Sequence, residues 1–599
     1  MTRYARVWCE LLVMSWHRIP LLTAVLMTLY ALSVVTVAAA ATTLRVAIDA
    51  MARDDLHRAV LAVVGCAVTY AVTMGLAVST ENLKVLCVER VGLTDLQERI
   101  HRDIASLQGL EHLERTDFLD RLTLVLGSAW ALMASLWTTV GSLATFLQLA
   151  VSLALLGSVS PWLLFLLAFA ALPVWFDHRG QRAINRTETD TAGAYRLQRQ
   201  LFELAVGAGS SKEIRVAGAA EELTLLQADA WNDAMDHRVH ARLVAAVWKL
   251  GGWGLFTAGF VAGLVIVVRQ AASGQGSVGD VVLAITVATT MRTTVYQAAK
   301  SAAETADAGR LIDPFLWLRD YVETTRSRSA GEVPAPSALR EGIRLSHVSY
   351  TYPGTDRKAL DDVSIDLPAG SVVAIVGEYG SGKSTLVKIL AKLYRWDTGS
   401  ITVDGSELEQ LDTTAWHSRC SVAFQDFGRF QTVFREVVGF GDLPHMDDRE
   451  RVSRAVAAAE ADAIVAKLPN GLDTQLGQTL GGVDLSEGQW QKTALARASM
   501  RAAPLLVVLD EPTASLDAPS EQQIFEKHMQ HARSVGGSVG AITIVVSHRF
   551  STVTRADVIL VLNQGRLVEA GSHAELLARG GQYAQLYGIQ SAAYAPTGP

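Results

Sequence analysis

Cysteine and charged residues are both scarce in this 599-residue chain, and each scarcity excludes a class of protein. The four cysteines, Cys9, Cys66, Cys87 and Cys420, lie far apart and form no CxxC pair. That pattern argues against a zinc site or a disulfide framework and fits a reducing, cytoplasmic environment. Only 19% of residues are charged, below the roughly 25% of soluble domains. The net charge of −7 lacks the basic excess of a nucleic-acid-binding protein.

Long apolar runs fill the first half of the chain, and each is near the roughly 20 residues that cross a bilayer. Six of them are predicted as membrane spans: Leu21–Thr43, Ala59–Ser79, Ala129–Gly157, Pro161–Phe176, Leu243–Val268 and Val278–Gln297. The first could pass for a signal peptide, because basic residues precede it, but its length and the later spans favour an uncleaved helix. The stretch before it is too short for a peptidase domain, so we do not expect the chain to trim a leader peptide.

Basic residues crowd the long connections that follow the second and fourth spans, whereas the other internal connections are short. The residues concerned are Arg90, Arg99, Arg102, Arg182, Arg186, Arg199, Lys212 and Arg215. The positive-inside rule therefore predicts that both long connections and both termini are cytoplasmic. Arg45, Arg53 and Arg58 in the first external loop run against this rule, although aspartates accompany them. Helical spacing in Leu86–Gln108 and Arg196–Leu226 predicts helices that continue out of the membrane, with surface-lying amphipathic helices as the alternative.

A Ser-, Arg-, Pro- and Gly-rich stretch separates this half from the next. We predict a membrane domain at 1–323, a linker at 324–342, a second domain at 343–590 and a flexible tail at 591–599. In the second domain, short β-branched runs alternate with helical patterns: Val372–Val376, Ile401–Val403, Leu505–Leu509, Ile542–Val546 and Val558–Leu562. This alternation predicts an α/β domain with a mainly parallel sheet.

The segment Gly377–Thr385 reads GEYGSGKST and matches the P-loop pattern GxxxxGK[ST]. It follows a predicted strand and opens a helical pattern, a context that argues against a glycine-rich turn without function. Backbone N–H groups and a helix N-terminus suit phosphate groups, Lys383 suits the β- and γ-phosphates, and the Ser384 hydroxyl suits Mg²⁺. The nucleotide-binding residues predicted here are Gly377, Glu378, Tyr379, Gly380, Ser381, Gly382, Lys383, Ser384 and Thr385.

The apolar run Leu505–Leu509 ends in two acids, Asp510 and Glu511. Beside a P-loop, such a strand can supply a magnesium ligand and a group that activates water. Asp510 suits the first role and Glu511 the second. Acids that merely end a strand are the alternative, which the neighbouring P-loop disfavours.

Further short motifs, in matching order and spacing, resemble those of the ABC transporter family. Leu485–Gln489 (LSEGQ) resembles the signature LSGGQ, Ala514–Asp517 the D-loop, and Ser547–His548 the switch histidine. Gln425 matches the Q-loop and Tyr352 the adenine-stacking aromatic residue. With six predicted spans upstream, the chain from Leu21 to Ile589 resembles an ABC exporter half-transporter of the type IV fold. The implied fold is a six-span helical membrane domain followed by a cytoplasmic P-loop ATPase domain.

The resemblance implies a role for each matching residue. Tyr352 would stack on adenine, Glu511 would polarise the attacking water, and His548 would hold the γ-phosphate. Gln425 would contact Mg²⁺ or that water, so the implied metal residues are Ser384, Gln425 and Asp510. Ser486 and Gly488 would close over the ATP bound by the opposite subunit, and the implied nucleotide-binding residues also include Gln489 and Asp517. ATP binding would close a dimer of two such chains, and hydrolysis would reopen it. Segments 111–115 and 209–213 resemble the coupling helices that dock near the Q-loop.

Two departures from the family pattern stand out. Glu487 replaces the first glycine of the signature, and a carboxylate beside a γ-phosphate is unfavourable unless it points away or pairs with a cation. It also removes the freedom of glycine, so we expect reduced but not abolished activity. Thr474–Leu480 lacks the glutamates of the exporter stretch TEVGERG. Because the Walker motifs are intact, a homodimer is favoured, with a heterodimer as the alternative.

The expected protein is an ATP-hydrolysing, multi-pass transporter of the bacterial cell membrane, with export favoured by the resemblance alone. An ATP-gated channel or a regulatory subunit is the alternative, against which the intact Glu511 argues, and the spans exclude a soluble ABC ATPase. The sequence does not identify the cargo. Candidates for a cavity lining are Trp130, Trp137, Thr138, Thr139, Trp248, Lys249, Trp253, Arg292 and Tyr296. If Lys249 and Arg292 face that cavity, an anionic cargo follows, although aromatic residues near span ends more often anchor the interface.

Overall fold

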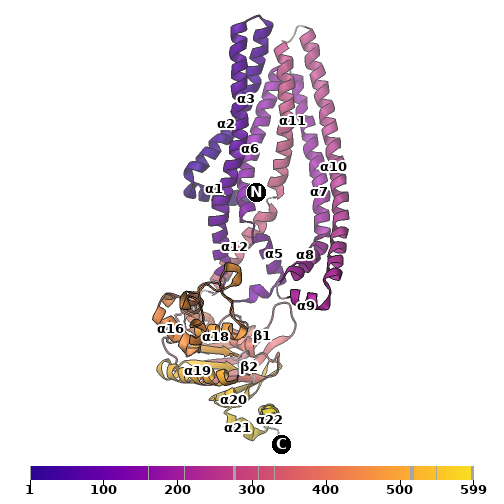
Figure 1. The fold of residues 1–599 in the computed structure, drawn as a ribbon. Helices are drawn as coiled ribbons and strands as arrows, with labels where there is room; N and C mark the ends of the chain where they lie inside the picture. Colours follow the sequence, from indigo (N-terminus) through magenta and orange to yellow (C-terminus); the bar gives the residue numbers. More distant parts are fainter. Residues whose placement is uncertain are drawn as a thin grey trace. The chain divides into compact units, whose positions relative to one another are not determined.

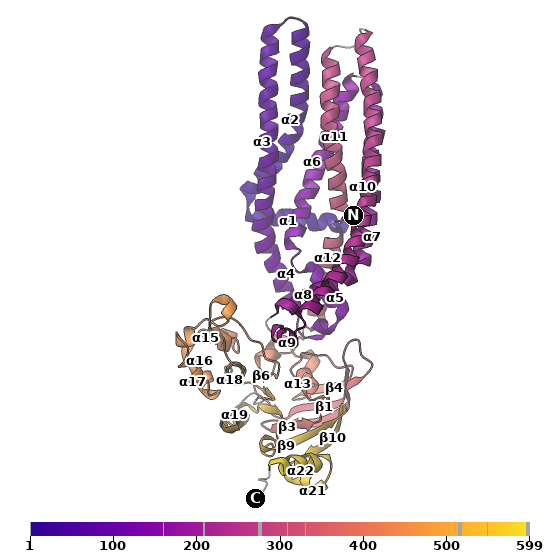
Figure 2. The ribbon, with the colours of Figure 1, turned by 45° about the vertical axis from the view of Figure 1, so that its right-hand side comes forward.

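The computed structural model describes residues 2–159, 161–207, 210–273, 278–307, 309–329, 331–512, 518–547 and 549–594. The chain forms two compact units. The first contains Met1–Arg102 and Thr123–Trp317, and the second contains Asp103–Leu122 and Leu318–Pro599. The first is built from long helices and the second from sheets flanked by shorter helices (Figures 1 and 2). A segment from the predicted membrane domain, Asp103–Leu122, thus groups with the C-terminal domain.

Long helices make up almost the whole of the first unit. Their bounds are α1 Thr2–Arg18, α2 Pro20–Ala52, α3 Leu56–Cys87, the π-helix η1 Val88–Leu96, α4 Gln97–Ala105, α6 Ala129–Val159, η3 Pro161–Phe165, α7 Leu166–Asp190, α8 Ala192–Val206, α9 Ser211–Ala217, α10 Ala220–Ala272 and α11 Val278–Asp307. Among the described residues, four helical stretches are long and apolar enough to cross a membrane: Pro20–Ala52, Leu56–Ala105, Ala129–Ser158 and Ala220–Gln270. The other two predicted spans are also helical and lie in η3–α7 and α11; Asp177 and Arg179 follow the first of them in α7, and Asp280 lies within the second.

Two of these helical stretches are much longer than a bilayer is thick. The 50-residue stretch Leu56–Ala105 and the 53-residue α10 measure about 75 and 80 Å at 1.5 Å per residue, against a hydrocarbon core of about 30 Å. Leu56–Ala105 is therefore one continuous helical stretch, as predicted for Leu86–Gln108. The second long connection contains a break near the turn expected at 209–213: α8 ends at Val206, and α9 ends at Ala217, followed by Gly218 with a left-handed φ of 66°.

Three helix pairs organise the first unit: α2 with α3, α7 with α10, and α6 with α11 (Figures 1 and 2). Ion pairs join the ends of α2 and α11, where Arg45 lies 2.7 Å from Asp280 and the Gly279 N–H donates to Asp49 at 3.0 Å. Arg58 lies 3.3 Å from Asp55. Arg45 and Arg58, which run against the positive-inside rule, are therefore neutralised by neighbouring carboxylates.

The second unit contains two sheets. Its strands are β1 Gly342–Thr351, β2 Lys358–Pro368, β3 Val372–Gly377, β4 Thr398–Val403, β5 Ser406–Glu407, β6 Cys420–Ala423, β7 Leu506–Asp510, β8 Ile542–Val546, β9 Val558–Asn563 and β10 Arg566–Gly571. The four-stranded sheet has the order β2-β1-β4-β5 and is antiparallel. The six-stranded sheet has the order β10-β9-β3-β8-β7-β6 and is parallel except for the β9–β10 pair.

Four of the predicted strands form the core of the parallel sheet, but the fifth does not. Ile401–Val403 lies in β4, which pairs antiparallel with β1, so its expected place in a parallel sheet is wrong. The reason lies in its burial: Ile401 and Val403 are buried while Thr402 between them is not, which is typical of a strand with one covered face.

The remaining helices belong to the second unit, except that the boundary between the two units falls within α5 and within α12. Their bounds are η2 Glu111–Glu114, α5 Thr116–Val125, α12 Gly309–Ser329, α13 Lys383–Leu390, η4 Leu408–Gln410, α14 Thr413–Ser418, α15 Phe434–Gly439, η5 Leu443–His445, α16 Arg449–Ala458, α17 Asp462–Val465, η6 Gly471–Asp473, η7 Gln478–Leu480, α18 Glu487–Ala498, α19 Ala518–Val539, α20 Phe550–Val553, α21 His573–Arg579 and α22 Gln582–Tyr594. Residues 324–329 and 591–594, from the predicted linker and tail, are therefore helical.

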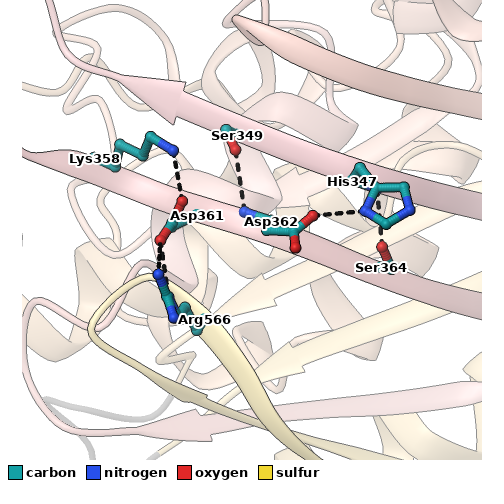
Figure 3. A network of polar contacts seen from close by, with 7 residues as sticks. All are labelled: His347, Ser349, Lys358, Asp361, Asp362, Ser364 and Arg566. Atoms are coloured by element: carbon teal, nitrogen blue, oxygen red, sulfur yellow. Dashed lines mark hydrogen bonds and ion pairs between the residues drawn. The ribbon is translucent and has the colours of Figure 1, made fainter.

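A polar network ties the two sheets together (Figure 3). Asp361 of β2 accepts from Lys358 at 2.6 Å and from Arg566 of β10 at 2.8 Å. The turn before Arg566 also touches the P-loop, because the Gly565 N–H donates to the Ser381 carbonyl at 3.1 Å. The β9–β10 hairpin thus contacts both β2 and the predicted phosphate loop.

Candidate functional site

The predicted P-loop connects β3 to α13. Gly380 and Gly382 have φ angles of 75° and 102°, in the left-handed region that favours glycine. A Cβ on Gly382 would come within 2.5 Å of the Ala359 carbonyl oxygen. Lys383 folds back over the loop and donates to the carbonyls of Gly377 and Glu378 at 3.0 and 2.8 Å. Glycine is therefore required where the loop turns. The Lys383 ammonium lies against the carbonyls at the start of the loop.

Other residues of the loop differ in their exposure. Ser381 is buried, and its Oγ has no hydrogen-bond partner among the described residues. Glu378 and Tyr379 are exposed. Thr385 is buried and its hydroxyl lies 2.9 Å from the hydroxyl of Tyr352. The structure thus brings the predicted adenine-stacking residue next to the start of α13.

Asp510 ends β7 as a buried carboxylate. Burial raises its pKa, and a hydrogen bond from Ser384 acts in the opposite direction. Its Oδ1 has no hydrogen-bond partner in the part of the chain that the structure describes. A buried carboxylate oxygen without a partner beside a serine hydroxyl is a donor set that suits Mg²⁺, which prefers hard oxygen ligands. Ser384 and Asp510 therefore fit the predicted metal.

Glu511 follows Asp510 and is held by contacts on several sides. The Gln425 side-chain amide donates to its carboxylate at 3.0 Å. Its backbone N–H donates to Val546 O at 3.0 Å, and Gln491 donates to its carbonyl at 3.2 Å. Its φ of 48° is left-handed, which is uncommon for a residue with a side chain and is often seen at functional sites. The predicted Q-loop glutamine and water-activating glutamate therefore meet directly.

Strand order explains why these residues meet. β3, β8 and β7 are adjacent and parallel, so their carboxyl ends reach the same edge of the sheet. The P-loop follows β3, Asp510 ends β7, and Ser547 follows β8. The charges interact accordingly: burial lowers the pKa of Lys383, while Glu511 and Asp510 act to raise it. His548 and the D-loop residues Ala514–Asp517 lie outside the described residues.

The signature segment opens α18 through a capping box. The Ser486 Oγ accepts from the Gln489 N–H, and the Gln489 side chain accepts from the Ser486 N–H at 2.8 Å. This pairing fixes the N-terminus of the helix. Ser486 and Glu487 are exposed there, and Gly488 is partly exposed. Glu487 forms an ion pair with Arg429, a residue of the loop that follows Gln425.

The chain resembles known proteins in both sequence and fold. Residues 360–514 match the family model described as ABC transporter. The fold matches the structure of a bacterial Atm1-family ABC exporter with ATP bound, with a TM-score of 0.78 and 25% identity, over 96% of this chain and 99% of that one. The chain has the fold of an ABC half-transporter. The fold class predicted from the sequence, a helical membrane domain fused to a P-loop ATPase domain, is confirmed.

Curated proteins similar to this chain include ATP-dependent lipid A-core flippases. The protein from Pseudomonas fluorescens strain Pf-5 is 37% identical over 328 residues, 54% of this chain and 52% of that protein. The protein from Pseudomonas aeruginosa PAO1 is 41% identical over 258 residues, 43% of this chain and 41% of that protein. The chain therefore spans about half the length of the curated relatives it matches.

The first predicted coupling segment contacts the nucleotide-binding domain within the second unit. The Leu110 N–H donates to Leu393 O at 2.9 Å, and the Arg395 N–H donates to the Glu111 carboxylate at 2.9 Å. The Tyr394 hydroxyl donates to Glu114, and the Tyr394 ring meets that of Tyr352 edge-on at 5.5 Å. The Tyr394 side chain thus contacts both Glu114 of this segment and Tyr352, the predicted adenine contact. Of the second segment, Gly209 lies outside the described residues.

A cavity of about 760 Å³ lies within the first unit, and its wall is both aromatic and charged. It is lined in part by Tyr30, Glu81, Lys84, Trp130, Trp137 and Gln148. Among the predicted lining residues, Trp130, Trp137 and Thr138 take part. Lys249 is not in this wall: it lies 3.5 Å from Asp177 and over the Tyr296 ring. The side chain of Arg292 lies outside the described residues.

Sequence reasoning missed several residues at these sites. Arg429 carried no motif signal, although a lone basic residue after the Q-loop could have been matched to the unusual Glu487. Gln491 and Tyr394 have no pattern of their own, because each is marked only by its contact with a residue of another segment, Glu511 and Glu114 respectively. Only the folded arrangement identifies them.

Proposed function

We propose that this chain is an ATP-hydrolysing half-transporter that moves cargo across a membrane, with export as the direction. The observation that carries the proposal is the meeting of Gln425, Glu511 and Asp510 with the P-loop at one sheet edge. The exporter fold and the flippase relatives support it. The proposed location is the bacterial cell membrane, with both termini in the cytoplasm. The helices that are long and apolar enough to cross a membrane support the membrane location.

Each predicted residue receives a role in ATP hydrolysis under this proposal. Lys383 and the loop N–H groups hold the phosphates, and Tyr352 contacts the adenine. Glu511, oriented by Gln425, accepts a proton from the attacking water, and His548 contacts the γ-phosphate. Mg²⁺, held by Ser384 and Asp510, supplies charge neutralisation to the phosphates when bound. Phosphoryl transfer needs mainly positioning and charge stabilisation, so closure of the site gates the reaction.

A second half-transporter completes this site. Ser486, Gly488, Gln489 and Asp517 are proposed to face the ATP of the partner subunit, and a homodimer is favoured because the ATP-holding residues are intact in this chain. The pair Glu487–Arg429 supports the heterodimer as a second candidate, because a modified signature is tolerated more easily when only one of two sites hydrolyses rapidly.

The cavity in the membrane unit is proposed to bind an amphiphilic cargo. Its wall combines the tryptophans with the ion pair Glu81–Lys84, whose charged atoms lie 2.7 Å apart. Two lining residues, Thr80 and Trp137, have buried polar atoms without a partner among the described residues. Buried polar atoms of this kind favour a ligand that offers hydrogen bonds. The lipid named for the flippase relatives is consistent with this chemistry.

The experiment that tests the proposal is ATP hydrolysis by the full chain in lipid. Glu511→Gln keeps the shape and the hydrogen bond to Gln425 but removes the base, so we expect turnover to fall by about 100-fold or more. Glu341→Gln, at an exposed glutamate of the same compact unit, should hydrolyse ATP normally. Equal turnover of Glu511→Gln and the unchanged chain would contradict the proposed role of Glu511. Negligible turnover of the unchanged chain, restored by adding a second half-transporter, would select the heterodimer.

A further inference from the structure

A groove between α1 and the η1–α4 segment carries positive charge on an apolar wall. Its volume is about 760 Å³, within the roughly 300–1,000 Å³ range of ligand pockets. It is lined in part by Arg6, Cys9, Val13, His17, Asp95 and Arg99. The residues on α1 recur every three or four positions and so form one stripe of the helix. The neighbouring stripe, Val7, Leu11 and Ser15, is buried.

The position of α1 places this groove at the boundary of the membrane. α1 ends at Arg18, and the first membrane-crossing helix begins at Pro20. Val13 and Trp16 of α1 are exposed by 54% and 51%, as is Leu21 at the start of α2. A basic amphipathic helix with exposed Trp and Val beside a span is typical of an interfacial helix, which lies at the level of lipid headgroups.

Among the described residues that line the groove, arginines outnumber acids. Arg18 lies 3.4 Å from Asp95 and is thereby partnered. Neither Arg6 nor Arg99 has a hydrogen bond or ion pair among the described residues, although Arg99 is only partly exposed. The lining includes three arginines, Arg6, Arg18 and Arg99, and two acids, Glu10 and Asp95. The groove therefore presents two unpartnered guanidinium groups, which bind phosphate oxygens well.

We propose that this groove binds one anionic phospholipid of the surrounding bilayer as a resident ligand. Arg6 and Arg99 hold the phosphate, and the apolar wall around Val13 contacts the glycerol and the first acyl carbons. A zwitterionic headgroup fits less well, because its cationic end adds to the excess positive charge. A free anion would leave the apolar wall unused. The proposal rests on the membrane position of α1 and is independent of ATP hydrolysis and of the cargo.

Lipid retention by the full chain tests this proposal. The chain is reconstituted in bilayers of phosphatidylcholine alone or of phosphatidylcholine and phosphatidylglycerol in equal amounts, and bound lipids are counted by native mass spectrometry after release. The variant is the double substitution Arg6→Gln with Arg99→Gln. The matched control is Arg3→Gln with Arg102→Gln, which removes the same charge from the same two helices outside the groove. Thermal unfolding of both variants verifies that they are folded.

We expect the unchanged chain and the control to retain phosphatidylglycerol in preference to phosphatidylcholine. The Arg6/Arg99 variant should retain it at least about fivefold more weakly, since each basic residue near an anionic lipid surface contributes about that factor. Equal retention by the variant and the control would overturn the proposal.

Cys9 gives a second readout, because it lines the groove and is exposed, whereas the other cysteines are partly or fully buried. Its alkylation should slow in bilayers that contain phosphatidylglycerol, and the Arg6/Arg99 variant should lose this protection. In a further experiment, Cys9 alkylation is measured in phosphatidylcholine bilayers with added inorganic phosphate. If phosphate protects Cys9 as well as the lipid does, the groove is a simple anion site and the lipid assignment is wrong.

Discussion

Arg429 forms an ion pair with Glu487, the residue that replaces the first glycine of the signature. Both side chains are 52% exposed, and exposed pairs contribute at most about 1 kcal/mol to stability. The pair is therefore better understood as local neutralisation than as a structural bond. From the sequence, a carboxylate at this position is expected to point away or to pair with a cation, and Glu487 pairs with Arg429.

Removal of Arg429 should reduce ATP hydrolysis only while Glu487 is present. Arg429→Ala leaves an unneutralised carboxylate at the signature, and a penalty of about 1 kcal/mol corresponds to about fivefold slower turnover. Glu487→Gly should raise turnover, and Arg429→Ala should then have little further effect. ATPase rates of the two single variants and the double variant in lipid measure this coupling. If Arg429→Ala slows turnover equally in the unchanged chain and in the Glu487→Gly variant, Arg429 does not act through Glu487.

Loss of the Gln425 amide should slow hydrolysis without preventing ATP binding. A hydrogen bond to a charged group contributes about 1.5–3 kcal/mol, so Gln425→Ala should slow turnover about tenfold or more. Gln425→Glu should be worse, because it places a second carboxylate against Glu511. Gln431→Ala, in the same loop, serves as the control. Nucleotide affinity measured beside turnover distinguishes a positioning role from a loss of binding.

Replacement of Asp510 should stabilise the nucleotide-free protein and abolish magnesium-dependent binding. Burial raises the pKa of Asp510 above its unfolded value, so the folded state binds this proton more tightly. The contribution of Asp510 to the free energy of unfolding therefore falls as the pH rises from the unfolded pKa of about 3.9 through the raised folded pKa. Asp510→Asn should therefore be more stable than the unchanged chain at neutral pH. Near pH 3 the two should be equally stable, because the carboxyl group of Asp510 is then already neutral. Thermal unfolding at both pH values checks this, and lower stability of Asp510→Asn at neutral pH would contradict it.

The contact between Tyr394 and Glu114 should matter for coupling more than for hydrolysis itself. Tyr394→Phe removes one hydrogen bond to a carboxylate, worth about 1.5–3 kcal/mol of stability. We expect basal ATPase activity to remain and its stimulation by cargo to fall. Tyr350→Phe is the matched control, because the buried Tyr350 hydroxyl has no partner among the described residues and its ring lies 5.3 Å from that of Tyr394. Equal loss of stimulation in both variants would point to the aromatic cluster instead of the hydrogen bond.

Much of this protein could be predicted because its signals are local. The P-loop depends on glycines that adopt left-handed φ angles within a few residues, and Asp510 and Glu511 directly follow an apolar strand. Helix length and apolar composition likewise follow from consecutive residues. The prediction failed for Ile401–Val403, because short apolar runs do not reveal whether a strand pairs parallel or antiparallel.

The sequence by itself determined the two-part architecture, the order of the ATP-site motifs and the unusual Glu487. Tertiary structure alone decided which side chains meet: Gln425 with Glu511, Arg429 with Glu487, and Glu114 with Tyr394. It also showed that Lys249 is neutralised by Asp177 and that Arg6 and Arg99 share one groove. The physical reason is that backbone conformation and burial follow from neighbours in the chain. Pairing between distant charges depends on how strands and helices are brought together.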